Sequence, residues 1–129
     1  FIVGGQIKDQ PPELYLVYPQ GNYIRTADSK PYLVIGEVKY GKPILDRVIT
    51  PKVSIGDASR CALISMDSTL KSDLTVGPPI DFAVIKKDEI KIASLKCLNM
   101  NDPEFSKVCN QWSQGIFKIF DSFQRFDWE

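Results

Sequence analysis

Histidine, the side chain that proteins use most often as a general base and as a metal ligand, does not occur in this sequence of 129 residues. A Ser-His-Asp or Cys-His enzyme is therefore excluded within the chain. The thiols of Cys61, Cys97 and Cys109 are scattered and lack the CxxC spacing of a zinc site. We therefore predict no metal, no cofactor and no disulfide framework, and the simplest reading is a cytoplasmic protein with reduced thiols.

Two glycine-containing stretches are also candidates for binding. Gly4 and Gly5 are not followed by a GxGxxG or a GxxxxGKS/T motif, so we expect a strand bulge or a close backbone approach there and not phosphate binding. The stretch from Gly77 to Pro79 either lines a substrate cleft or only turns the chain, and the sequence does not separate these readings.

Composition narrows the possible partners. The chain is 43% hydrophobic and 25% charged, and its 16 basic residues balance its 16 acidic residues. Nucleic acids and anionic membranes require a basic excess or a basic face, so neither is an expected partner. No apolar stretch approaches the roughly 18 residues that a membrane-spanning helix needs.

The elements that must position any site follow from the spacing of apolar residues. Period-two and doubly apolar patterns predict strands at residues 1–7, 13–18, 23–26, 32–35, 80–86 and 90–95. Spacing of three and four predicts helices at residues 41–49, 54–76 and 102–123. Strands and helices come in blocks, which favours an α+β fold with antiparallel sheets. Strands with two apolar faces predict a sheet covered on both sides.

The second predicted helix has the clearest local signals. Ser54 is a good N-cap, and Asp57 stands three residues later, as in a capping box. A stripe of small residues follows and suits close packing against a neighbouring element: Ala58, Cys61, Ala62, Ser65 and Thr69.

Three runs carry a resemblance to a known family: YPQGN (18–22), IGEVKYGKPILDR (35–47) and SMDSTLKSDLTVGPPID (65–81). With the strand that contains Gly4 and Gly5, they resemble the middle and later part of proteasome-type N-terminal-nucleophile hydrolases. The similarity is greatest to the bacterial branch called the ancestral β subunit, or Anbu, and covers about residues 1–89.

This resemblance implies part of a four-layer αββα sandwich in a homo-oligomeric ring or stacked assembly. It also implies a peptidase that acts on peptides or unfolded proteins, with the side chain of an N-terminal Thr as nucleophile and its α-amine as base. The chain opens with an interior-like strand, so we expect residues 1–129 to be the C-terminal part of one domain. The fragment alone is then expected to be inactive.

The resemblance also assigns candidate supporting residues. Asp67, followed by Ser68, matches an Asp-Ser pattern that holds the N-terminal Thr through hydrogen bonds, although Asp67 could instead be a solvated helix residue. Leu70 stands where that family has a further Ser, and Thr69 or Ser72 could substitute. Glu37 stands where the family has a Ser, either as a replacement partner or as a structural charge.

Two functional readings remain, a threonine-dependent peptidase subunit and a non-catalytic scaffold subunit with the same fold. An unrelated α+β binding domain is a distant third. The aromatic end of the chain has two readings as well. It either packs on its own sheet or forms a subunit contact through Phe117, Phe120, Phe123, Phe126 and Trp128.

Overall fold

The computed structural model describes residues 1–89 and 91–128. One antiparallel sheet has the order β1 (Ile2–Gly5), β2 (Glu13–Val17), β3 (Tyr23–Arg25), and a second pairs β4 (Ile80–Ile85) with β5 (Ile92–Leu98). The helices are α1 (Lys42–Val48), α2 (Ile55–Ser72) and α3 (Pro103–Asp121). The predicted α+β class with antiparallel sheets is confirmed.

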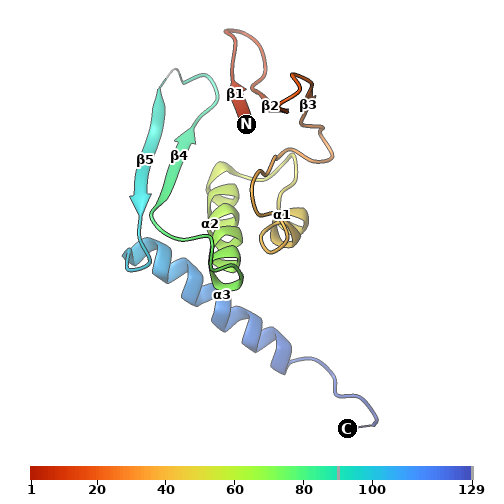
Figure 1. Cartoon of the computed structure of the whole chain (residues 1–129). Coiled ribbons are helices and arrows are strands. Elements are labelled where there is room, and N and C mark those ends of the chain that lie inside the picture. The colour runs from red at the N-terminus through yellow and green to blue at the C-terminus, as the bar shows by residue number, and fades with distance from the viewer. Residues whose placement is uncertain (90, 129) are drawn as a thin grey trace.

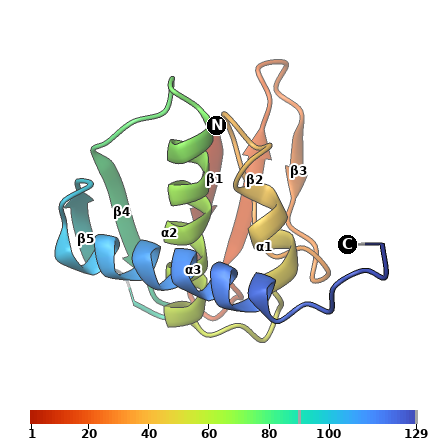
Figure 2. The same cartoon turned by 90° about the horizontal axis from the view of Figure 1, so that it is seen from below.

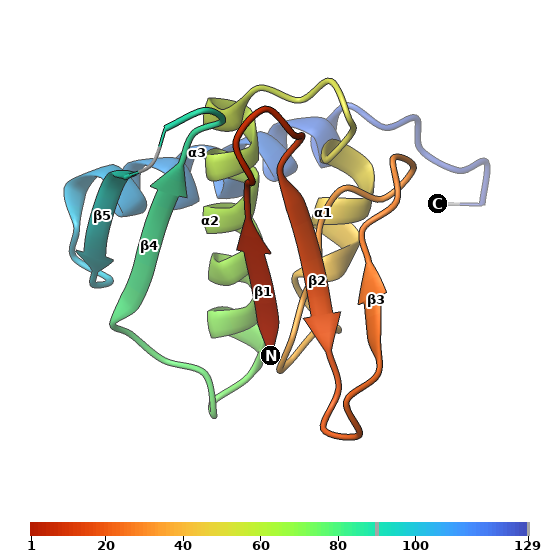
Figure 3. The same cartoon turned by 90° about the horizontal axis from the view of Figure 1, so that it is seen from above.

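Helices and strands are segregated in space. Helix α2 lies between the β1–β3 sheet and α3, so α3 is outermost on the side away from that sheet (Figures 1 and 2). Seen from above, both sheets stand in front of the helices (Figure 3). Helix α2 packs against both α1 and α3 and is the central element. The described residues therefore cover one side of the strands, and not both sides as the doubly apolar strands predicted.

Local sequence signals fix the ends of several elements, and the cap predicted at Ser54 is confirmed. The hydroxyl of Ser54 accepts a hydrogen bond from the Asp57 N–H at 3.0 Å and caps α2. The Asp102 carboxylate caps α3 by accepting the Phe105 N–H at 3.1 Å. Gly21, with φ +87°, makes the tight turn between β2 and β3, a conformation that glycine adopts without a steric penalty.

The stripe of small residues on α2 allows α1 to approach very closely. A Cβ atom added at Gly41 would lie 2.3 Å from Ser65 Oγ, 2.9 Å from the Ser65 carbonyl oxygen and 3.1 Å from Thr69 Oγ1. Only glycine fits at this position without movement of a helix. The predicted role of the stripe in close packing is therefore confirmed.

The buried core is small. Among the described residues, the hydrophobic side chains that are buried are Cys61, Ile80, Leu98, Phe105 and Cys109. All but Cys61 cluster where α3 meets β4 and β5, with apolar side chains of α2 packed against them. The accessible surface is 10130 Å², whereas a compact protein of this mass exposes about 6,900 Å². Much apolar surface is thus left uncovered by the chain itself.

Two strand predictions need correction. Residues 32–35 form no ladder, since they pair with no other strand among the described residues. The last strand was predicted at 90–95, but β5 runs from Ile92 to Leu98, and Ile90 lies outside the described residues.

The second helix also ends earlier than predicted, at Ser72, because Asp73 is extended with φ −132° and ψ 113°.

The tips of the two hairpins are joined by a reciprocal pair of hydrogen bonds. The Gln6 amide donates to Asp88 Oδ1 at 2.7 Å, and the Asp88 N–H donates to Gln6 Oε1 at 2.7 Å. The two sheets are therefore fastened at one end, although β1 and β4 do not pair with each other.

Candidate functional site

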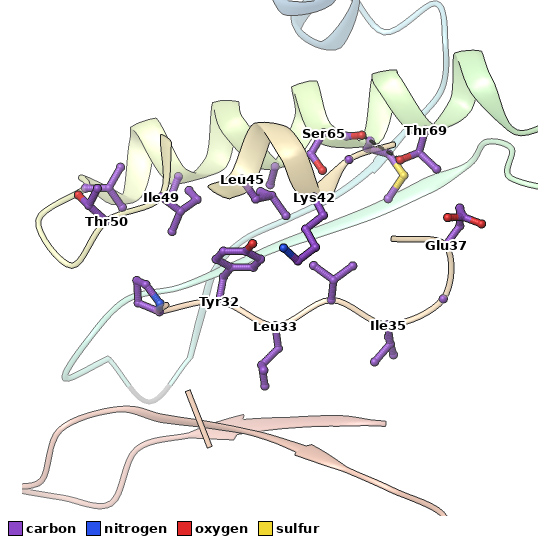
Figure 4. Close-up of a pocket in the computed structure, with 18 of the residues that line it drawn as sticks. Tyr32, Leu33, Ile35, Glu37, Lys42, Leu45, Ile49, Thr50, Ser65 and Thr69 are labelled. Carbon is purple, nitrogen blue, oxygen red and sulfur yellow. Dashed lines mark hydrogen bonds between the residues drawn. The ribbon is translucent and has the colours of Figure 1, made fainter. Parts of the chain in front are cut away.

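A groove of about 690 Å³ runs between the extended segment 31–37 and the helices α1 and α2 (Figure 4). Its walls are mainly apolar and include side chains such as Leu33, Val34, Leu45, Ile49 and Val53. The cleft is therefore apolar, with the segment 31–37 on one side and α1 and α2 on the other.

The groove brings together some of the predicted site residues. Glu37 and Thr69 lie at the same end of it, and Ser65 lies beside Thr69 (Figure 4). The Thr69 hydroxyl donates to the Ser65 carbonyl at 3.0 Å, within its own helix. Glu37 accepts the N–H of Lys39 at 2.7 Å, which closes the turn after Gly36. Both side chains therefore have a structural partner within the chain.

Asp67 and Ser68 do not line the groove. Asp67 is 2% exposed and faces the interface of α2 with α3, so it is not a solvated helix residue. Lys71 Nζ lies 2.8 Å from Asp67 Oδ2, whereas Asp67 Oδ1 has no hydrogen-bond partner among the described residues. The pKa of the Cys109 thiol is raised to about 11, mainly because the thiol is buried and to a smaller extent because the Asp67 carboxylate lies nearby. Asp67 and Thr69 thus project from different faces of α2.

A charged cluster surrounds Asp46 beside Tyr32 and Lys42, which lie between Thr50 and Glu37 along the groove (Figure 4). The Asp46 carboxylate accepts from the Lys42 ammonium and from the Tyr32 hydroxyl, and Lys30 Nζ lies 3.7 Å away. The pKa of Asp46 is lowered to about 2, mainly by the hydrogen bond from the Lys42 ammonium and secondly by the hydrogen bond from the Tyr32 hydroxyl. Burial and the hydrogen bond to Asp46 raise the pKa of Tyr32. This cluster ties the segment 31–37 to α1.

Asp73 is a carboxylate that the sequence analysis did not single out. It follows α2 directly, and its Oδ1 accepts the Thr75 N–H at 2.8 Å and the Thr75 hydroxyl at 2.7 Å. Those hydrogen bonds lower the pKa of Asp73, and the Lys39 ammonium adds to the effect. The Asp-x-Thr spacing of an Asx turn was the signal in the sequence. Ser72, the other predicted substitute, is exposed at the last position of α2.

Two other kinds of site do not occur within the described ranges 1–89 and 91–128. No three His, Cys, Asp or Glu side chains gather there as they would around a metal ion. None of the helices there combines the length and hydrophobicity needed to cross a membrane.

The class of protein follows from solved structures with the same arrangement of strands and helices. Anbu from Hyphomicrobium sp. strain MC1 superposes with a TM-score of 0.92 and 42% identity, over 98% of this chain and 54% of its own. Anbu (ancestral beta-subunit) from Yersinia bercovieri superposes with a TM-score of 0.94 and 40% sequence identity, and the match covers 98% of this chain and 54% of the relative. A subunit of the helical assembly of the Anbu complex from Pseudomonas aeruginosa has a TM-score of 0.91 and 42% sequence identity, and the match covers 97% of this chain and 52% of the relative. The fold is therefore proteasome-like.

The chain belongs to the Anbu family. It spans about half the length of the relatives that it matches. No family model matches the sequence, and no curated protein matches it. The resemblance noted in the three sequence runs is confirmed, and an unrelated α+β binding domain is ruled out.

Proposed function

We propose that this chain is part of a threonine-dependent peptidase subunit that assembles with copies of itself and cleaves peptides or unfolded proteins in the cytoplasm. The observation that carries the proposal is the similarity to Anbu at 40–42% identity over 97–98% of the chain. The helical assembly formed by the Pseudomonas aeruginosa relative supports self-association. The nucleophilic Thr, with its α-amine as base, would lie in polypeptide outside these 129 residues.

The groove is the proposed docking place for that polypeptide. Its apolar walls would bury hydrocarbon from further strands, and the excess of accessible surface over that of a compact protein supports such coverage. At its end, Glu37 and Thr69 would lie near the incoming segment. The incoming segment would exclude water from that end, and this would strengthen the electrostatic interactions of the Glu37 carboxylate with any charged group that the segment brings.

Two carboxylates compete for the supporting role. Asp67 matches the family pattern, but in this chain it is paired with Lys71 against α3. Asp73 lies at the end of α2, near Lys39, and is half-buried. A carboxylate keeps a neighbouring lysine charged, and it orients an amine by accepting a hydrogen bond from it, so either residue would suit the supporting role. We propose Asp73 as the second candidate, to be compared with Asp67.

A scaffold subunit without activity is the alternative function. It is favoured by the existing partners of Glu37, Thr69 and Asp67, each of which has a hydrogen bond or ion pair within the chain. A scaffold would need the fold and the assembly contacts, but no free catalytic group.

An epoxyketone inhibitor separates the two functions, because it reacts with an N-terminal Thr through both the hydroxyl and the amine. The polypeptide as encoded by the gene is incubated with the inhibitor and with fluorogenic peptides, and the adduct is located by mass spectrometry. A peptidase gives an adduct at an N-terminal Thr and measurable turnover, whereas residues 1–129 alone give neither. An assembled protein without an adduct or turnover would support the scaffold.

A further inference from the structure

The first sheet, β1–β3, is held to the rest of the molecule by few contacts. The main contacts between elements pair neighbouring strands within each sheet and pair α2 with α1 and α3, so none of them links the first sheet to a helix or to the second sheet. Within residues 1–89 and 91–128, no ion pair joins residues 1–26 to the later residues, and the only hydrogen bonds that do so link Gln6 with Asp88. We name this pair the Gln6–Asp88 clamp.

The clamp is made by groups that its own hairpin already holds in place. The Gln6 amide nitrogen donates to Asp88 Oδ1 at 2.7 Å and to the Gln10 carbonyl, in the same hairpin, at 2.8 Å. The Gln6 amide oxygen accepts the Asp88 N–H at 2.7 Å. Each polar atom of the Gln6 side chain therefore has a partner, and a hydrogen bond that an amide donates to a carboxylate is stronger than one between neutral groups.

The backbone at Asp88 indicates that its carboxylate has a specific role. Asp88 lies in the turn after β4 in the left-handed conformation, with φ +64°. Glycine adopts this conformation without a steric penalty, whereas a residue with a Cβ atom does not. Glycine would also keep the N–H that donates to Gln6, but it would lose the carboxylate that accepts from it. Asp9, in the turn of the first hairpin, has the same φ and takes no part in the clamp.

The clamp lies at the end of the molecule away from the candidate site. Strand β1 ends at Gly5 and β4 ends at Ile85, and the turns that follow both strands lie beside the start of α2 (Figures 1 and 3). Thr69 and Asp73 belong to the other end of α2. Among the described residues, no hydrogen bond joins the two sheets at that second end. A sheet that is fastened at one end only can change its spacing at the other.

We propose that the Gln6–Asp88 clamp is a pivot between the two sheets: it fixes their spacing at one end and leaves it variable at the end that carries the candidate site. Groups that bind at the candidate site can then move the sheets apart without breaking their connection. The pivot requires neither peptidase activity nor self-association, so it holds or fails independently of the proposed function.

Distances between nitroxide labels, measured by double electron–electron resonance on the polypeptide as encoded, test the pivot. One label pair, at Lys8→Cys and Lys87→Cys in a Cys97→Ser background, reports on the clamp end. A second pair, at Asn22→Cys and the exposed native Cys97, reports on the candidate-site end. Labelled protein is diluted with unlabelled protein so that only distances within one copy are measured. In the wild type, the distance distribution should be narrower at the clamp end than at the candidate-site end.

Variants of the clamp should broaden the distribution at the clamp end. Asp88→Gly should raise the open population at least about tenfold relative to Asp9→Gly, since a hydrogen bond to a carboxylate is lost. Asp9→Gly is the matched control, because it relieves the same φ of +64° and leaves the clamp intact. Gln6→Glu places two carboxylates opposite each other and should also open the clamp. Adding Asp88→Asn to Gln6→Glu exchanges donor and acceptor, so this double variant should close the clamp again.

Circular dichroism shows which variants remain folded, and if Asp88→Gly unfolds, Gln6→Glu and its rescue by Asp88→Asn decide the question. The pivot is refuted by an unchanged clamp-end distribution in the folded variants, by a double variant that stays open, or by a wild type whose clamp end is as broad as its candidate-site end. The epoxyketone is scored separately. A pivot in a protein that is not labelled counts against the peptidase alone, and labelling of a protein with a broad clamp end counts against the pivot alone.

Discussion

Replacing Gly41 by alanine is expected to force α1 away from α2. The new methyl carbon would lie 2.9 Å from the Ser65 carbonyl oxygen, whereas ordinary contact begins at 3.4 Å. The Ser65 hydroxyl, at 2.3 Å, can rotate aside, but the carbonyl belongs to the α2 backbone and cannot. Helix α1 must therefore retreat by the difference, about 0.5 Å, and a methyl group forced into a close contact costs about 1–3 kcal/mol.

Urea unfolding followed by circular dichroism measures this cost. Gly115→Ala is the matched control, because its new methyl meets nothing within 4 Å in the middle of α3. It should stabilise the protein by up to about 1 kcal/mol, since alanine is the better helix former. Adding Ser65→Ala to Gly41→Ala removes the hydroxyl but not the carbonyl, and should restore only part of the loss. A Gly41→Ala protein that is as stable as the control would refute the packing argument.

Three further predictions concern ionisable groups. Asp67→Asn should keep the free energy of unfolding within about 1 kcal/mol, because the lysine paired with Asp67 is half-exposed and screened by solvent; a larger loss in urea unfolding would contradict this. The pKa of Asp46 is lowered from 3.8 to about 2, so its contribution to stability is present above pH 3.8 and disappears as the pH falls towards 2. Asp46→Asn should therefore flatten that part of the curve of unfolding free energy against pH. Iodoacetamide at pH 8 should modify exposed Cys97 first, and buried Cys61 and Cys109 only on unfolding, as counted by mass spectrometry.

Local rules predicted the parts of the fold that depend on neighbours in the sequence. The cap at Ser54 and the stripe of small residues beside Gly41 need only a few adjacent residues, and the structure confirms both of them. The segment 32–35 shows the limit of such rules. Its apolar pattern suits a strand, but a strand also needs a partner distant in the sequence, and none pairs with it among the described residues.

The candidate site could be predicted only in part, for a similar reason. The motif that contains Asp67, Ser68 and Thr69 identifies a helix, but the side chains of consecutive residues point to different faces. Which face meets the groove and which meets α3 depends on how the helices pack. The structure therefore separates Asp67 from Thr69, and brings Thr69 to Glu37, which stands 32 positions earlier.

The two short sheets also affect how the protein must be handled. Each sheet ends in strands whose outer N–H and C=O groups have no ladder partner within ranges 1–89 and 91–128. Such edges pair readily with any extended polypeptide, including another copy of the chain that has not yet folded. Under the proposal that further strands complete these sheets, soluble yield should depend on how quickly those strands bind, and co-expression with them should succeed where separate expression gives inclusion bodies.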